Sequence, residues 1–247
     1  MHIKLKGVVL RKTAISDHDA YLHVFTEDRG VVSVLARGIG RGKSGMSAAA
    51  QSLSLCEFTL FAGRDRYIAN AIDLVEPFVE LRSNLSGLSL AAYFGEIVSR
   101  LFDEGTDSGQ AFRLFLNCLF LLSKKALPER QIKSIFELRV CALAGFAPDL
   151  SACRLCGSGS AQPMYFDVQE GTLQCGACGG AGLLVNPSVL AAMRHIVYAP
   201  GEKLFRFTLS PPSDRQLYSV TEQYLMLKSE KVYPSLNFYR SVADESI

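Results

Sequence analysis

Four of the seven cysteines stand in two pairs at the spacing of metal ligands. Cys153 and Cys156 form one Cys-x-x-Cys pair, and Cys175 and Cys178 form a second pair eighteen residues later. Such a pair bends around a zinc ion as a tight turn, and a glycine after each second cysteine permits the positive φ that the turn uses. Four thiolates complete a tetrahedral site and leave no position for a reacting water. The spacing therefore predicts one structural zinc ion per chain.

Two redox-active Cys-x-x-Cys pairs are the alternative interpretation. Redox pairs of the thioredoxin type lie where a strand meets a helix, and neither pair here is predicted to do so. The intervening MYFDVQEGTLQ, with Glu170-Gly171 as its turn, indicates the hairpin of a zinc ribbon over about residues 150–182. The three remaining cysteines lie in apolar runs, where we expect them to be buried hydrophobic residues; they are Cys56, Cys118 and Cys141.

The stretch ARGIGRGKSG, residues 36–45, ends like the loop that binds phosphate in P-loop NTPases. That loop needs a glycine at position 37, and the residue there is Arg37. A strand rather than a crossover helix is also expected next, which further disfavours a nucleotide pocket. The glycine-rich loop still carries Arg37, Arg41 and Lys43 without an acidic neighbour. This pattern favours contact with the phosphate backbone of a nucleic acid.

Charge is unevenly distributed along the chain. Residues 1–66 hold ten Lys and Arg against six Asp and Glu, whereas the rest of the chain is slightly acidic. The start MHIKLKGVV has no signal-peptide h-region, and the longest apolar stretch is too short for a bilayer span. We expect a soluble, cytoplasmic protein without a membrane partner, whose basic surface lies at its N-terminal end.

Short β-rich runs separated by turn signals fill the first part of the chain. Five such strands in about 75 residues, without a helical crossover, predict a small antiparallel barrel. An OB-type barrel over residues 1–78 is the favoured form, and an SH3-like barrel is the alternative.

Beyond Glu76-Pro77 the apolar residues follow helical spacing, so residues 79–247 are predicted to form an all-α domain with the zinc ribbon inserted. Pro128, Asn186-Pro187 and Ser210-Pro211 mark helix starts, and Gly145 marks a helix end. The fold class is thus α+β with two domains.

No catalytic constellation stands out. The four histidines are scattered, and neither H-E-x-x-H nor G-x-S-x-G occurs. We therefore expect a protein that is not an enzyme. His23, on a predicted strand, is interpreted as a solvent-facing structural residue.

The run KGVVLRKTAISDHDAYLHVFTEDRGVVSVLARGIGRGKS resembles the N-terminal part of bacterial RecO recombination-mediator proteins. IFELRVCALAGFAPDLSACRLCG is similar to that family's Phe-Glu-Leu helix, Ala-Pro corner and first zinc knuckle. The resemblance covers nearly the whole chain. Arg37 stands where the family usually has lysine, and Gly40 and Gly42 make the basic loop unusually rich in glycine.

The resemblance implies a DNA repair and recombination mediator of the RecF pathway. Such a protein binds single- and double-stranded DNA, anneals complementary strands, and works with RecR to load RecA on DNA coated by single-strand-binding protein, SSB. It would be cytoplasmic and associated with the nucleoid. An RNA-binding OB and zinc-ribbon module of translation is the alternative.

Two sets of contact residues follow from these interpretations. The DNA-binding set combines the basic loop with the cations of the first strand; it is Arg37, Arg41, Lys43, Lys4, Lys6, Arg11 and Lys12. The resemblance also suggests that the helical domain binds the acidic, Phe-ended tail of SSB. The helix after Pro128 offers an apolar stripe flanked by cations, and its expected tail contacts are Arg130, Lys133, Phe136 and Arg139.

Overall fold

The structure is a computed structural model that describes residues 1–39, 45–63 and 66–243. The chain divides into two compact units. The first, here called the barrel unit, comprises residues 1–126 and 233–247, and the second, the ribbon unit, comprises residues 127–232. The predicted boundary at residue 78 corresponds to the end of the barrel but not to the edge of a unit, because the next helices pack on the barrel within the same unit.

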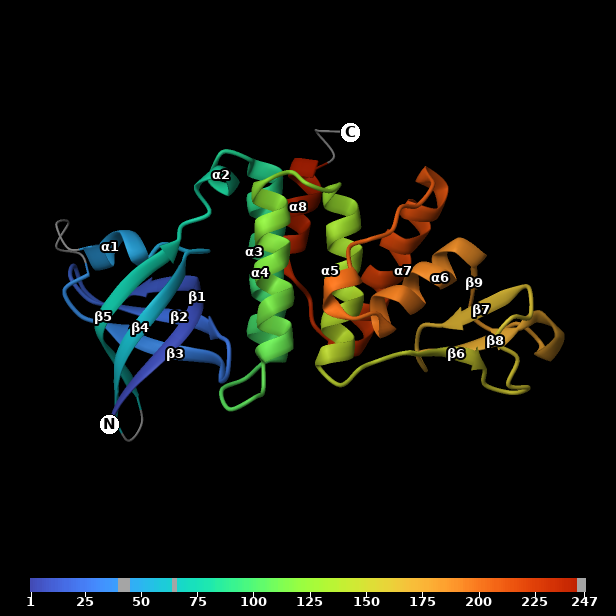
Figure 1. Ribbon diagram of the computed structural model, residues 1–247, viewed down its shortest axis with the longest axis horizontal. Helices are drawn as coiled ribbons and strands as arrows, with labels where there is room; N and C mark the ends of the chain where they lie inside the picture. Colours follow the sequence, from blue (N-terminus) through green and yellow to red (C-terminus); the bar gives the residue numbers. More distant parts are fainter. Residues whose placement is uncertain (40–44, 64–65, 244–247) are drawn as a thin grey trace. The chain divides into compact units, whose positions relative to one another are not determined.

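Five strands of the barrel unit close into a barrel in the order β1-β2-β3-β5-β4 (Figure 1). Their bounds are β1 His2–Ala14, β2 Ala20–Thr26, β3 Gly30–Ala36, β4 Leu55–Ala62 and β5 Tyr67–Glu76. The five strands confirm the pattern seen in the sequence. Their expected antiparallel pairing is wrong at one place, because β3 and β5 pair in parallel through Val34–Tyr67 and Leu35–Ile68.

Alternation of side chains along the strands builds the barrel interior. On β2, Leu22 and Val24 point inward and are fully buried, while Tyr21 and His23, which alternate with them, are only partly buried. Strand β1 departs from strict alternation because its register with β2 shifts between Val9 and Arg11. A β-bulge of this kind bends a strand and re-aims the side chains that follow it.

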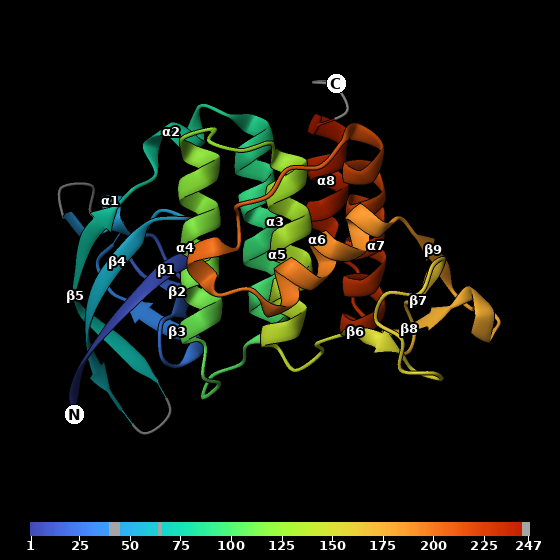
Figure 2. The same cartoon turned by 45° about the vertical axis from the view of Figure 1, so that its right-hand side comes forward.

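The helices of the barrel unit are α1 Gly45–Ala49, α2 Val79–Arg82, α3 Leu85–Leu101, α4 Gly109–Ser123 and α8 Pro234–Ala243. Helices α3 and α4 lie along one side of the barrel, as Figures 1 and 2 both show, and α8 packs against α3 in the same unit. The ring of Phe25, on β2, lies 5.7 Å from that of Phe112 and 5.8 Å from that of Phe115, both on α4. These aromatic contacts join barrel and helices in one core.

The ribbon unit is built on three helices, with a short helical turn between the second and the third. They are α5 Glu129–Leu143, α6 Pro187–Tyr198, η2 Gly201–Lys203 and α7 Pro211–Ser229. Helix α6 begins as the sequence predicts, because the Asn186 side chain accepts a hydrogen bond from the Ser188 amide at 2.9 Å and Pro187 occupies the first turn. Gly145, just beyond α5, has a φ of 93° and ends that helix as expected. Within the described residues, none of the helices of either unit has the length and apolar character needed to cross a bilayer.

A small four-stranded sheet between α5 and α6 in the sequence forms the ribbon, in the order β6-β8-β7-β9. Its strands are β6 Asp149–Cys153, β7 Met164–Asp167, β8 Thr172–Cys175 and β9 Leu183–Val185. Strands β7 and β8 are the predicted hairpin, and Gly171 at its turn has a φ of 72°. Asp167 Oδ1 accepts hydrogen bonds from the amides of Gln169 and Glu170, each at 3.0 Å, which fixes the turn.

Candidate metal centre and nucleic-acid interface

The first cysteine pair lies on a tight turn at the end of β6. Cys153 is the last residue of this strand, and its carbonyl oxygen accepts a hydrogen bond from the Gly157 amide at 2.9 Å. Gly157 has a φ of 73°, a conformation that a residue with a Cβ atom adopts at a cost. The turn brings Cys156 back toward Cys153, as the spacing predicts.

The second pair repeats this arrangement at the end of β8. Cys175 ends the strand, and the 3-10 turn η1, Gly176–Cys178, carries the chain to Cys178. Gly179 follows with a φ of 104° and donates from its amide to the Gly176 carbonyl at 3.1 Å. Neither pair lies at a strand-to-helix junction of the kind that thioredoxin-like redox chemistry uses.

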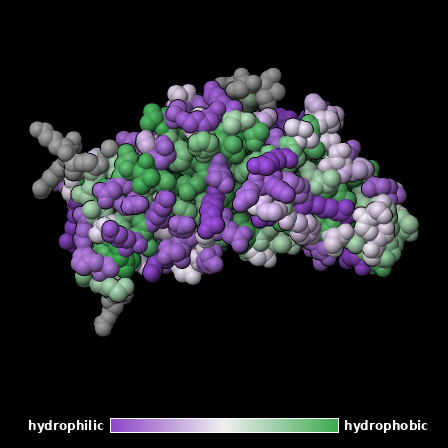
Figure 3. Space-filling model, in the orientation of Figure 1, coloured by the Kyte–Doolittle hydropathy of each residue, from purple (hydrophilic) through white to green (hydrophobic). Residues whose placement is uncertain are grey.

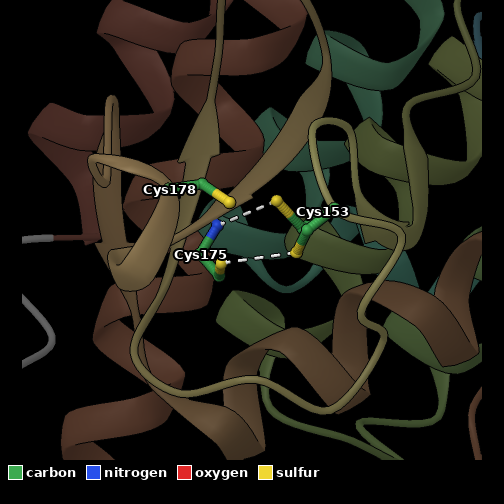
Figure 4. Close-up of side chains that lie close together, drawn as sticks. Cys153, Cys175 and Cys178 are labelled. Atoms are coloured by element: carbon green, nitrogen blue, oxygen red, sulfur yellow. Dashed lines mark hydrogen bonds between the residues drawn. The ribbon is translucent and has the colours of Figure 1, made fainter.

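The four sulfur atoms converge on one point. They all lie within 4.8 Å of one another, and the Sγ atoms of Cys156 and Cys175 are 3.7 Å apart. Figure 4 shows the thiols of Cys153, Cys175 and Cys178 directed toward one another. A tetrahedral zinc ion with four thiolate ligands separates their sulfurs by about 3.8 Å, so the donor set and its spacing fit a metal ion.

Hydrogen bonds shift the pKa values of two of the thiols in opposite directions. The Cys175 amide donates to the Cys153 Sγ at 3.3 Å and, with the amides of Cys156 and Leu155, lowers the pKa of Cys153 to about 6. Hydrogen bonding to the sulfurs of Cys175 and Cys156, together with burial, raises the pKa of Cys178 to about 12. One thiolate is thus stabilised by the backbone, whereas full deprotonation of the cluster requires a cation.

An arginine outside the cluster supports the first turn. Arg194, on α6, donates from Nε to the Leu150 carbonyl at 2.6 Å and from a terminal nitrogen to the carbonyls of Ser151 and Gly159 at 3.2 and 3.0 Å. These three carbonyls flank the segment that carries Cys153 and Cys156. The sequence offers no signal for this role, because the donor and its acceptors are 35 to 44 residues apart.

The predicted DNA-binding cations of β1 lie on the surface of the barrel. Lys4 and Lys6 are exposed and stand on one face of the strand, opposite Thr59 and Glu57 of β4. Arg11 and Lys12 are also exposed, beyond the bulge. Arg37 is exposed directly after β3, and the predicted contacts Arg41 and Lys43 lie outside the described residues.

An aromatic patch lies next to these cations, and the sequence reading missed it. Phe61, on β4, is 42% exposed, and its ring meets the imidazole of His2 edge-on at a centroid distance of 5.7 Å. Asn70 contacts the His2 Nδ1 at 3.1 Å. Figure 3 shows hydrophobic and hydrophilic residues interspersed over the barrel. Where a cation lies beside an exposed ring, the cation can hold a phosphate and the ring can stack on a base.

The start of the basic loop is fixed to the loop between β1 and β2. The Gly38 amide donates to Asp19 Oδ1 at 2.9 Å, and Ile39 is buried in the barrel core. Ser16 Oγ accepts from the amides of His18 and Asp19, which shapes the β1–β2 loop itself. The root of the basic loop is therefore held in place at Gly38.

Family comparisons decide what kind of protein carries these features. The family model described as Recombination protein O N terminal matches residues 1–78, and the model described as Recombination protein O C terminal matches residues 82–237. The chain belongs to the RecO family.

Curated relatives match over almost their full length. The DNA repair protein RecO of Acetivibrio thermocellus is 32% identical over 244 residues, which are 98% of this chain and 97% of the relative. The DNA repair protein RecO of Alkaliphilus metalliredigens is 31% identical over 235 residues, 94% of this chain and 96% of the relative. That of Desulforudis audaxviator is 28% identical over 246 residues, 98% and 97% of the two chains.

In this member of the RecO family, the predicted contacts of the SSB tail have partners within the ribbon unit. Phe136 is fully buried in the core, and Lys133 is fully buried between Glu137 and Glu222. Arg139 donates to the carbonyls of Ile196 and Val197 at 3.1 and 2.5 Å.

Arg130, the remaining member of this set, is partly exposed. Its Nε lies 3.9 Å from Asp214 Oδ2, and its side chain is 32% exposed. Binding of the SSB tail stays a prediction. The side chains of Lys133 and Phe136, two of its predicted contacts, are not exposed to solvent.

Proposed function

We propose that this chain is a non-catalytic mediator of DNA repair and recombination that binds single- and double-stranded DNA and anneals complementary strands. The observation that carries the proposal is the RecO-family match across both parts of the chain. DNA repair is the role that the names of the curated relatives print. The mediator would work with RecR to load RecA on SSB-coated single strands in the RecF pathway, at the nucleoid.

The barrel is proposed as an OB-type DNA-binding domain. Support comes from its five strands, its closed order β1-β2-β3-β5-β4 and the parallel pair β3–β5, which suit a Greek-key barrel of this class. Backbone contacts are assigned to the exposed cations on β1 and after β3, and base stacking to Phe61. The loop cations Arg41 and Lys43 complete this assignment.

The metal of the ribbon is proposed to be zinc, one per chain. Four thiolates are ligands that zinc accepts in closed structural sites, and the spacing of the sulfurs suits a tetrahedral ion. A bound zinc ion would supply the positive charge that four thiolates need and would hold the two turns together. Its role is therefore assigned to folding of the ribbon unit rather than to chemistry.

For the SSB tail, the proposal keeps Arg130 as the cation most able to meet a carboxylate, since it is partly exposed and its nearest acid is at 3.9 Å. The test is a charge reversal, Arg130→Glu, with binding of a labelled SSB tail peptide as the readout. Arg113→Glu is the matched control, because Arg113 is an exposed arginine on α4. Equal loss of tail binding in both variants, or in neither, contradicts the assignment of Arg130.

The function itself is tested by binding and annealing with the purified full chain. We expect tight binding of an oligothymidine and of a duplex at low salt, and faster pairing of complementary strands without nucleotide. A competition with structured RNA separates this from an RNA-binding role. Preferential binding of the RNA, or no acceleration of annealing, would contradict the proposal.

A further inference from the structure

A cavity of about 750 Å³ lies within the barrel unit, between the outer face of β1–β3 and helix α3. Its barrel side includes the apolar residues Leu10, Val31 and Leu53, with the polar side chains of Arg11 and His23 beside them. The α3 side contributes Leu88 and the exposed Ala92. Ligand sites in proteins are commonly clefts of about 300–1,000 Å³ with mostly apolar walls and a few placed polar groups, so the size and walls of this cavity suit a small ligand.

Charged side chains on the lining give the cavity an excess of positive charge. Glu96 is neutralised by Arg100, at 2.6 Å, and also accepts from the Ser235 amide at 3.2 Å. Among the described hydrogen bonds and ion pairs, Arg11 and Arg82 meet only neutral groups. Arg11 lies 3.3 Å from His23 Nε2, and Arg82 donates to the Ser52 carbonyl at 3.2 Å. The lining thus presents two guanidinium groups to an anion.

Backbone strain at the cavity supports a functional role. Leu53 has a φ of 65°, in the left-handed region that a leucine rarely adopts. Its amide donates to the Val9 carbonyl at 2.6 Å, and the Arg82 contact with Ser52 holds the preceding residue. Residues kept in such conformations cluster at ligand sites.

We infer that this cavity binds one unstacked nucleotide of single-stranded DNA, with the base between the apolar walls and the adjoining phosphate at Arg11 and Arg82. The inference rests on the proposed DNA-binding function and goes further, because it names the site and the part of the ligand that enters it. Arginine suits this position because its planar group pairs with phosphate oxygens. Bases in a duplex are stacked and paired, so only a single strand can supply the base at low cost.

Filling the cavity tests the inference without removing a charge. Ala92→Trp places a large side chain in the cavity from an exposed helical position, so the core is left intact. We expect oligothymidine affinity to fall about tenfold, as loss of one stacked base does, while duplex affinity stays within about twofold. The matched control is Asn117→Trp, at an exposed position on α4 that does not line the cavity, and it should change neither affinity.

The salt dependence of binding separates the contribution of the phosphate from that of the base. Arg11→Ala should lower the slope of log affinity against log salt for the oligothymidine by about one phosphate contact, whereas Ala92→Trp should leave the slope unchanged. Arg113→Ala removes the same charge from an exposed position outside the cavity and serves as its control.

Each outcome decides between alternatives. Normal single-strand affinity in Ala92→Trp, with DNA binding otherwise intact, overturns the inference and leaves the proposed function standing; the cavity would then suit an acidic peptide of a protein partner. Equal losses for single strand and duplex also overturn it. A wild-type chain that binds neither DNA overturns the proposed function as well.

Discussion

Arg194 lies against Leu150: its Nε donates to the Leu150 carbonyl at 2.6 Å, and the same guanidinium group also reaches Ser151 and Gly159. One side chain of α6 therefore holds the segment that presents the first two ligand thiols. Hydrogen bonds from a charged donor to carbonyls are stronger than those between neutral groups. The geometry of the candidate metal site depends in this way on a residue outside the four cysteines.

Replacing this residue should weaken the metal site. We expect Arg194→Ala to accelerate loss of zinc to a chelator by about tenfold, because the turn of Cys153 and Cys156 loses its outer support. A colorimetric chelator assay on freshly purified protein measures the rate. Arg206→Ala, which removes an exposed arginine of the same unit, should release zinc at the wild-type rate. Equal rates in wild type and Arg194→Ala would show that the ligands alone set the stability of the site.

Removing one ligand tests the metal centre itself. Cys175→Ser should reduce bound zinc from one ion per chain to well under one, because Cys175 ends β8 inside the cluster. The melting temperature of this variant should fall more clearly than its DNA affinity, since the metal supports folding of the ribbon unit. Elemental analysis and thermal unfolding give the two readouts, and Cys118→Ala, which removes a buried cysteine outside the cluster, is the control for zinc content. Full zinc occupancy in the serine variant would contradict the four-thiolate site.

A buried ion cluster joins α5 to α7, and breaking it should be costly. Lys133 Nζ lies 2.7 Å from Glu137 Oε1, 2.8 Å from Glu222 Oε2 and 3.8 Å from the centre of the Tyr218 ring. Lys133→Met leaves two carboxylates without their cation, and we expect a loss of about 3–5 kcal/mol in the free energy of unfolding. Chemical denaturation measures it. Restoring much of the loss with Lys133→Met plus Glu222→Gln would confirm the electrostatic cause, and a loss below about 1 kcal/mol would contradict it.

The pH dependence of this cluster has a definite sign. Burial lowers the pKa of Lys133, but the carboxylates of Glu137 and Glu222 outweigh it and raise the pKa above its ordinary value of 10.5. A group whose pKa is raised on folding contributes its full stabilisation below pH 10.5. This contribution is lost as the pH rises through the pKa of the group in the folded protein. Stability measured above pH 10.5 should therefore fall more steeply in wild type than in Lys133→Met.

His23 provides a local probe of the barrel surface. Burial, and secondarily the charge of Arg11 at 3.3 Å, lowers the pKa of His23 below its ordinary value of 6.5. Arg11→Ala should raise that pKa only part of the way, because burial is the larger cause. An NMR titration of the imidazole gives both values, and Lys12→Ala is the neighbouring control. A His23 pKa that is unchanged in Arg11→Ala would show that the two side chains do not interact in solution.

Local signals in the sequence were sufficient for much of this structure. The Asn186-Pro187 cap, the paired cysteines and the alternation along β2 each depend on residues close together in the chain, and each is found as predicted. The parallel pairing of Val34 with Tyr67 has no local signal, because it joins strands separated by the basic loop and β4. Helix α8 was also not predicted.

Long-range pairing explains why part of the candidate site was missed. Lys133 follows the pattern of a surface cation on an amphipathic helix, yet it is fully buried against Glu222, a partner 89 residues away in the chain. The cavity cations Arg82 and Arg100 come from helices that the sequence assigns to another domain. Only the folded chain brings such residues together.

The salt dependence of DNA binding tests the central claim most directly, namely that the basic barrel contacts the DNA backbone. The measurement compares wild type with a variant in which Arg37, Arg41 and Lys43 are all replaced by alanine. Because each phosphate contact releases counterions, we predict weaker binding and a slope of log affinity against log salt that is shallower by up to about three contacts. The triple variant Arg113→Ala, Arg206→Ala and Lys231→Ala, which removes the same charge elsewhere, should keep the wild-type slope. An unchanged slope in the loop variant would contradict the account.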